Sequence, residues 1–323
     1  MAIHNLGYRH CEGQRGSHRT RWLVLTENGI RRAWASAWLR RMLFFAWLPS
    51  VLMGFMIFLY EQSESTDDPF TRAFIQMGTA LLEPGGQGNM QPSGMLGFLR
   101  EKDDHPGETR HLFWSSLLLT LFRRSQPFIL IPMLGVITPP MVSQDIRSRA
   151  FLLYFSRPLS RTQYIVGKLA TVIFYVLLIT LMPALMLFCT GLLLSPDLSV
   201  LTSTGDLPGR ILLASLLIAV PAASLSLMLS SLTTESRFAG FAWFSIWIFG
   251  AFTAAILSNS TWGDASSPLK YLSLFEVFSE VAGSILDPQL ASSNLEEPVS
   301  ILAVITAVSL AVLFRRISAP MQV

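Results

Sequence analysis

The chain has 323 residues, of which 51% are hydrophobic and only 14% are charged, with a formal net charge of +3. Its mean hydropathy is +0.47, and a soluble domain of this length needs far less apolar surface to fill its core. The composition excludes an ordinary soluble protein and indicates a membrane protein. The small positive charge comes mostly from arginines that flank apolar segments and face lipid, so it gives no support for nucleic-acid binding.

The N-terminal region divides into two parts. Residues 1–18 are polar and unpatterned, which predicts disorder. Residues 19–41, "RTRWLVLTENGIRRAWASAWLRR", interleave tryptophans with arginines, which predicts a cytoplasmic amphipathic helix with its aromatic rings at the headgroup level. Gly29 is expected to break this helix in two. The alternative interpretation is an anchor whose arginines serve only to keep it in the cytoplasm.

Six apolar stretches are long enough to cross a bilayer, which takes roughly 17 to 25 mostly apolar residues. They are 42–60, 126–143, 164–194, 211–230, 238–258 and 299–314. The chain is therefore predicted to be an all-α polytopic membrane protein with a six-helix transmembrane domain at 42–314 and a cytoplasmic tail at 315–323. Pro183 is expected to kink the long third span.

The orientation follows from the distribution of basic residues, since Lys and Arg concentrate in cytoplasmic segments. With both termini in the cytoplasm, the inner segments carry sixteen Lys and Arg and the outer segments carry eight. We therefore expect an integral protein of the bacterial inner membrane with both ends cytoplasmic. Arg123 and Arg124 conflict with this assignment, because they fall outside, directly before the second span.

The outer loops contain two further apolar segments. The loops themselves are predicted at 61–125, 195–210 and 259–298. Residues 111–122 are apolar but too short to span, so a surface helix in the outer leaflet is expected. Residues 271–286 carry apolar residues at helical spacing, with Glu276 and Glu280 on another face. This segment is expected either to lie on the membrane or to re-enter it.

The inner loop 144–163, "QDIRSRAFLLYFSRPLSRTQ", has strong local signals. Ser160 followed by Gln163 is a capping box, which starts the third helix near Arg161. Pro158 places a turn at residues 157–160, and a short helix is expected upstream, from about residue 144 to 155. This pattern predicts a helix, a tight turn and another helix at the cytoplasmic face.

The same loop contains the apolar hexapeptide "AFLLYF", residues 150–155. The arginines around it are explained by the positive-inside effect alone, with Lys168 reaching out to the interface. That explanation does not account for six apolar residues in an aqueous loop, which must rest on lipid headgroups or fill a groove on another protein.

The order "QDIRSRAFLLYFSRPLSRTQYIVGKL", residues 144–169, resembles the loop between the second and third spans of the type-2, exporter-type ABC transporter permeases. The acidic residue of that family matches Asp145, its Ser-Arg-Pro-Leu-Ser-Arg turn matches residues 156–161, and its Gly-Lys pair matches Gly167 and Lys168. One departure is that Arg149 and Ala150 stand where the family has a glycine in the short helix.

The resemblance implies that the loop is a coupling element that seats in a groove on a cytoplasmic ATPase subunit and transmits its closure on ATP. The knob of this element would be Phe151, Leu152, Tyr154 and Phe155, held at a fixed angle by the proline turn. The full set of coupling residues implied is Asp145, Arg147, Arg149, Phe151, Leu152, Tyr154, Phe155, Arg157, Pro158 and Arg161.

The chain itself offers no catalytic, metal or cofactor site. "VGKL" at 166–169 is not a phosphate-binding loop, because Thr162 stands where the first glycine is needed and Leu169 where Ser or Thr must follow the lysine. ATP and magnesium are therefore expected in the partner ATPase. The expected partners are two ATPase subunits, a second identical or related permease subunit and membrane lipid.

Three functions are compatible with this pattern. The first is the permease subunit of an ABC exporter. The second is a non-transporting anchor that passes ATPase-driven motion to an extracytoplasmic partner. The third, an ion-driven carrier, is disfavoured because the spans lack paired acids. Ser, Thr and Gly in 224–234 and 245–255 fit either a polar cavity or close helix contacts.

Overall fold

The structure is a computed structural model that describes part of the chain. The described residues are 20–65, 106–151, 154, 159–195, 200–258, 271–286 and 295–318. Every regular element within them is a helix, which confirms the all-α class. The region predicted to be disordered, 1–18, and most of the first outer loop lie outside the described residues.

The helices follow the expected order along the chain. They are α1 (Arg21–Trp34), α2 (Ala37–Ser65), α5 (Pro106–Thr120), the π-helical turn η2 (Leu121–Ser125), α6 (Gln126–Ile137), α7 (Pro139–Arg147), α9 (Arg161–Leu194), α10 (Val200–Thr204), α11 (Leu207–Leu232), α12 (Ser236–Ser258), α13 (Leu274–Leu286) and α14 (Glu296–Ser318). Six segments are long and apolar enough to cross a membrane, as predicted: Ala37–Glu61, Arg110–Arg147, Arg161–Leu194, Val200–Leu232, Ser236–Ile256 and Glu296–Ser318.

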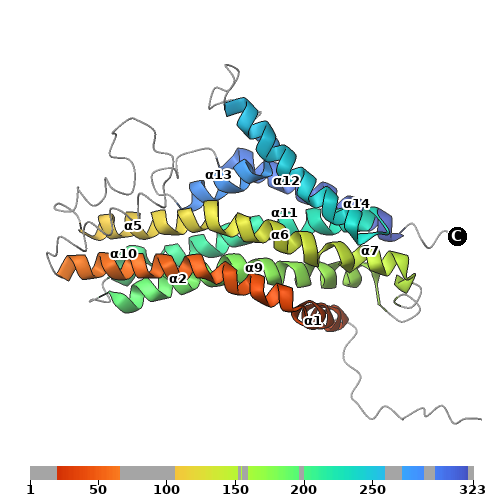
Figure 1. The fold of residues 1–323 in the computed structure, drawn as a ribbon, viewed down its shortest axis with the longest axis horizontal. Helices are drawn as coiled ribbons and strands as arrows, with labels where there is room; N and C mark the ends of the chain where they lie inside the picture. The colour runs from red at the N-terminus through yellow and green to blue at the C-terminus, as the bar shows by residue number, and fades with distance from the viewer. Residues whose placement is uncertain are drawn as a thin grey trace, which may run out of the picture.

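The long helices form one bundle, and α1 crosses it. In Figure 1, α2, α9 and the run from α5 to α6 extend along the long axis, whereas α1 is seen end-on. α1, α7 and the last turns of α14 lie toward the same end of the bundle. We call this the basic end, because it carries Arg147, Arg161, Lys168 and Arg316. The opposite end is called the far end.

The predicted break of the N-terminal helix at Gly29 is wrong. α1 runs through Gly29 and ends at Trp34, and α2 starts at Ala37. Gly29 instead allows close approach to α9, since a Cβ there would lie 2.6 Å from Thr171 Oγ1. The break falls beside Ala35 and Ser36, where Arg40 donates a hydrogen bond of 2.9 Å to the Trp34 carbonyl and so satisfies an end of α1.

The prediction of a surface helix at 111–122 is also wrong. α5 continues through η2 into α6, so these residues belong to the candidate span Arg110–Arg147. Their apolar side chains are buried among other helices. Trp114, for example, packs against Gly191 of α9, where an added Cβ would lie 2.7 Å from the Trp114 ring. The arginine pair of η2 interrupts the apolar run in the sequence and hides this continuity.

Residues 271–286 were expected either to lie on the membrane or to re-enter it, and the structure shows that most of this segment is a helix packed among the other helices. α13 packs against α5, α11, α12 and α14, and its apolar residues Val277, Val281 and Ala282 are fully buried. Its start also lies deep, since a Cβ on Gly250, within α12, would come 3.3 Å from the Ser273 Cα. α13 is therefore an internal helix of the bundle.

A buried serine joins α11 to the junction of α6 and α7. Ser230 Oγ donates to the Pro139 carbonyl at 2.6 Å and accepts from the Val142 and Ser143 amides at 3.2 Å each. Pro139 breaks the regular bonding between α6 and α7, and Ser230 supplies partners for the backbone groups exposed there. Ser230 thus serves a close helix contact, whereas Ser224, Ser226 and Ser231 donate to carbonyls of their own helix.

Candidate coupling site at the basic end

The predicted start of the third span is confirmed in detail. Ser160 Oγ accepts a hydrogen bond from the Gln163 amide at 3.2 Å, and the Gln163 side chain accepts from the Ser160 amide at 3.2 Å. This reciprocal capping box satisfies two backbone donors and begins α9 at Arg161. The loop therefore enters α9 in a fixed direction.

A turn at 148–149 interrupts the upstream helix, which was expected to be continuous to about residue 155, and helical backbone resumes at Ala150 and Phe151. α7 stops at Arg147, and Ser148 donates its amide to the Gln144 carbonyl at 2.9 Å. Arg149 has φ 51°, in the left-handed region. Glycine adopts this conformation without strain, whereas other residues need roughly 1–2 kcal/mol. Arg149 thus keeps the backbone turn in the stretch where the resembled family has glycine.

This geometry predicts that Arg149→Gly will stabilise the protein. Removing the Cβ relieves the left-handed strain, and the gain is reduced by the greater entropy of glycine in the unfolded chain. We expect the free energy of unfolding to rise by about 0.5–1 kcal/mol, measured by denaturant titration in mixed micelles. Arg149→Ala keeps the strain and should give no gain; an equal gain from alanine would show that the arginine side chain, not φ, is responsible.

A buried acid forms the centre of the site. Asp145 is 6% exposed, and its Oδ2 accepts from Tyr164 Oη at 2.7 Å and from Lys168 Nζ at 2.8 Å. Lys168 also donates to the Met141 carbonyl at 2.8 Å. Lys168 therefore turns inward to bind α7 and does not reach out to the interface. These contacts tie the end of α7 to the first two turns of α9.

Two aromatic residues of the predicted knob pack on the same centre. Phe151 is only 7% exposed, and its ring lies edge-on to Tyr164 at 5.4 Å between centroids. The Tyr154 ring lies 5.7 Å from that of Tyr164. Burial raises the pKa of Tyr154, the nearby Asp145 charge raises it further, and Arg32 opposes this. Tyr154 is accordingly a neutral phenol at physiological pH.

α1 encloses the start of α9 from another side. Thr26 Oγ1 donates to the Gly167 carbonyl at 3.1 Å, and Tyr175 Oη donates to the Ile30 carbonyl at 2.8 Å. Arg32 reaches α7, where it donates to Gln144 Oε1 at 3.0 Å. α1 therefore packs on α9, and side-chain contacts join α7 to both helices.

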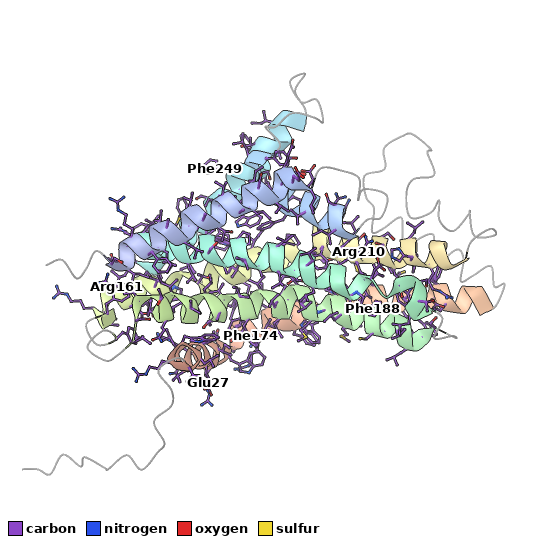
Figure 2. The ribbon with its side chains drawn as sticks, turned by 180° about the vertical axis from the view of Figure 1, so that it is seen from behind. Glu27, Arg161, Phe174, Phe188, Arg210 and Phe249 are labelled. Atoms are coloured by element: carbon purple, nitrogen blue, oxygen red, sulfur yellow. The ribbon has the colours of Figure 1, made fainter. Side chains whose placement is uncertain are left out.

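The structure brings together only part of the predicted coupling set. Asp145, Phe151 and Tyr154 meet around Tyr164, whereas Arg149 and Arg161 are exposed; Figure 2 shows Arg161 at the basic end. Arg147 is also exposed and pairs with Glu235 at 3.1 Å. The remaining residues, Leu152, Phe155, Arg157 and Pro158, lie outside the described residues.

The sequence interpretation did not identify Tyr164 as a functional residue. Its signal was available, because Tyr164 and Lys168 are four residues apart and so share a face of α9. Arg32 binds Gln144 of α7, and Arg147 binds Glu235 in the turn between α11 and α12. No local spacing in the sequence indicates these partners.

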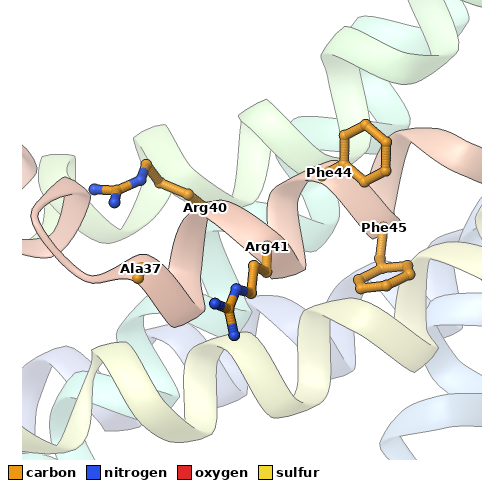
Figure 3. Close-up of a pocket in the computed structure, with 5 residues that line it drawn as sticks. All are labelled: Ala37, Arg40, Arg41, Phe44 and Phe45. Carbon is orange, nitrogen blue, oxygen red and sulfur yellow. The ribbon is translucent and has the colours of Figure 1, made fainter.

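A shallow hollow lies on the surface at the start of α2. Its volume is about 510 Å³, and it is lined by Ala37, Arg40, Arg41, Phe44 and Phe45. Figure 3 shows Arg40 with Phe44 and Arg41 with Phe45 along the same helix. Phe44 is 73% exposed. The hollow is open at the surface, and none of its lining residues belongs to the Asp145 centre.

The comparison with known families agrees with the resemblance found in the loop. The model of the family described as ABC-2 family transporter protein matches residues 41–316. The matched range begins in α2 and covers the Asp145 centre, four candidate spans in full and most of the first and last spans, whereas α1 lies outside it. No curated protein and no solved structure matches the chain.

Proposed function

Because the chain belongs to the ABC-2 transporter family, we propose that it is the membrane-spanning permease subunit of an ABC exporter. Membrane components of this family generally work with separate ATPase subunits. In the proposed complex, two such subunits bind ATP and magnesium, and a second permease subunit completes the membrane part. The basic end faces the cytoplasm, because basic residues favour that side.

The observation that carries the proposal is the buried Asp145 centre. The carboxylate holds α7 to α9 through Tyr164 and Lys168, and Phe151 and Tyr154 pack the intervening chain on the same tyrosine. In this proposal, a force applied to the loop passes to α9 directly through these contacts. Such a rigid connection is what a coupling element requires.

The inward position of Phe151 changes how the roles are divided. A side chain that is 7% exposed in the subunit offers almost no surface to a partner, so we assign Phe151 and Tyr154 to supporting the loop from within. Docking on the ATPase is then assigned to Leu152 and Phe155, with Arg147, Arg149 and Arg161 available for acidic groups at the rim of the groove.

The transport path is proposed to lie between two subunits. Ser230 of α11, which was expected either to line a cavity or to make a close helix contact, makes a contact with Pro139. The same tight seam favours the alternative, a non-transporting anchor that transmits motion to an extracytoplasmic partner. Turnover of ATP in liposomes that contain only the two subunit types separates these functions, because the anchor needs its outer partner for full activity.

The test of the coupling assignment is co-purification with the ATPase encoded beside this gene. We expect wild type to retain the ATPase in detergent and the Leu152→Asp, Phe155→Asp double variant to lose it at least about tenfold, because two charges would enter an apolar groove. The matched Leu152→Val, Phe155→Leu variant should retain it. Phe151→Asp is unsuitable, because a buried charge there would unfold the site.

Two results would contradict the assignment. One is wild type that retains no ATPase. The other is a double aspartate variant that elutes as a folded protein and binds the ATPase as wild type does. Either result would leave the loop as a charged membrane edge without a docking role.

A further inference from the structure

The arginine pair of η2 has no role in the coupling site. Arg123 and Arg124 lie within the candidate span Arg110–Arg147, which has 38 residues. A helix of that length extends about 57 Å, nearly twice the thickness of the hydrocarbon core, which is about 30 Å. Only part of the helix therefore lies in hydrocarbon.

The depth of the pair follows from contacts at the other boundary. Gln144 binds Arg32 of α1, the helix that crosses the bundle and carries tryptophans and arginines as interfacial helices do. Arg124 precedes Gln144 by twenty residues, about 30 Å along a helix. No charged residue stands between 125 and 143. With one membrane boundary at Gln144, Arg124 stands one hydrocarbon thickness away, at the level expected for the other boundary.

The two arginines have different environments although they share one π turn. Arg123 Nε donates to the Ser279 carbonyl of α13 at 3.1 Å. Its guanidinium also packs against Gly283, where an added Cβ would lie 2.7 Å from it. Arg124 is exposed, and among the residues that the structure describes none accepts a hydrogen bond or ion pair from it. Its positive charge is available to a ligand.

An apolar strip extends from Arg124 toward the basic end. Phe128, Pro132 and Val136 follow it at intervals of four residues, and each interval turns about 40° further round the helix, so the strip winds away from Arg124. Phe128 is 81% exposed and Val136 is 48% exposed. The strip is about 18 Å long. A cation at the membrane boundary above an apolar strip of this length complements a phosphate headgroup with an acyl chain.

We propose that Arg124 binds the phosphate of a membrane phospholipid and that the acyl chain of this lipid lies along Phe128 and Val136. In the orientation with both termini cytoplasmic, the lipid is in the outer leaflet. The planar guanidinium matches a phosphate with two parallel hydrogen bonds. Through Arg123, the same π turn is fixed to α13. The bound lipid therefore holds the turn to which α13 is joined.

The test uses the full chain in dodecyl maltoside with phosphatidylglycerol that carries a photoreactive diazirine in its headgroup. The measured quantity is the yield of crosslinks to the peptide 121–128, determined by mass spectrometry. Arg124→Gln should lower this yield about tenfold, because a charged hydrogen-bonding group is lost. Arg41→Gln, which removes an exposed arginine near the other boundary, should not change it. Unlabelled phosphatidylglycerol should compete, whereas diacylglycerol with the same acyl chains should not.

Several outcomes would overturn the proposal. An unchanged yield in Arg124→Gln would show that the guanidinium does not hold the headgroup, and equal competition by diacylglycerol would reduce the site to an apolar strip. If ATP, added with the partner ATPase, empties the site, the occupant is a cargo and not a resident lipid. If chain-to-chain crosslinks replace lipid crosslinks in wild type, a second copy covers the strip. The crosslinking yields of the variants are measured without the ATPase. They therefore test lipid binding even if the proposed transport function is wrong.

Discussion

Lys168→Met is expected to lower the free energy of unfolding by about 3–5 kcal/mol, because it leaves the Asp145 carboxylate buried without its cation. Both side chains are well covered, with exposed fractions of 14% for Lys168 and 9% for Asp145. The double variant Asp145→Asn, Lys168→Met should recover most of the loss, since a neutral amide still accepts from Tyr164. Denaturant titration of the purified chain in mixed micelles measures all three proteins.

The matched control for this prediction is the exposed ion pair at the same end of the bundle. Arg147 and Glu235 are 66% and 36% exposed, so Arg147→Met should change the free energy of unfolding by less than about 1 kcal/mol. A loss in Arg147→Met as large as that in Lys168→Met would show that burial does not determine the effect. If the double variant Asp145→Asn, Lys168→Met were no more stable than Lys168→Met, the loss would come from the missing attraction between Asp145 and Lys168 and not from an unpaired buried charge.

The helix start at Arg161 was predictable because its cause is local. Ser160 and Gln163 are three residues apart, and the capping box needs nothing from the rest of the protein. The continuity of α5 with α6 was not predictable in this way. Arg123 reaches a carbonyl on α13, more than 150 residues along the chain, and this distant partner lets the apolar segments on both sides of the pair form one helix.

The site shows the same division between local and distant causes. The spacing of Tyr164 and Lys168 places them on one face of α9, and the loop motif pointed to Asp145. The sequence pattern did not indicate that Phe151 faces inward, because an apolar side chain in a loop fits a partner's groove and its own subunit equally well. The direction is decided by the Tyr164 ring, which offers Phe151 an edge-on contact within the subunit.

Gly29 illustrates why a glycine within a helical pattern was misinterpreted. Its low helix propensity predicted a break, but the helix continues, because the missing side chain lets α1 approach Thr171 of α9. Gly167 has the reciprocal position on α9, facing α1. The two glycines together set the distance between the amphipathic helix and the third span, and a substitution at either position tests this contact directly.

Gly167→Ala is expected to separate α1 from α9 and to lower the free energy of unfolding by about 1–3 kcal/mol, because an added Cβ would overpack the contact. That Cβ would lie 2.9 Å from Leu25 Cδ2 and 3.0 Å from the Trp22 carbonyl oxygen. The leucine can rotate, but the carbonyl belongs to the backbone of α1, so the helix itself must move. The Thr26 hydrogen bond to the Gly167 carbonyl should lengthen, which exposes residues of α1 to proteolysis.

Gly209→Ala is the matched control for Gly167→Ala. Gly209 is also helical, and a Cβ there meets nothing within 4 Å, so alanine should raise the free energy of unfolding by up to about 1 kcal/mol through its helix propensity. Opposite signs from the same substitution would attribute the loss at Gly167 to the α1 contact. If both variants were stabilised, α1 would be only loosely attached to α9. The joined helices α1, α7 and α9 could then not transmit force from the coupling loop.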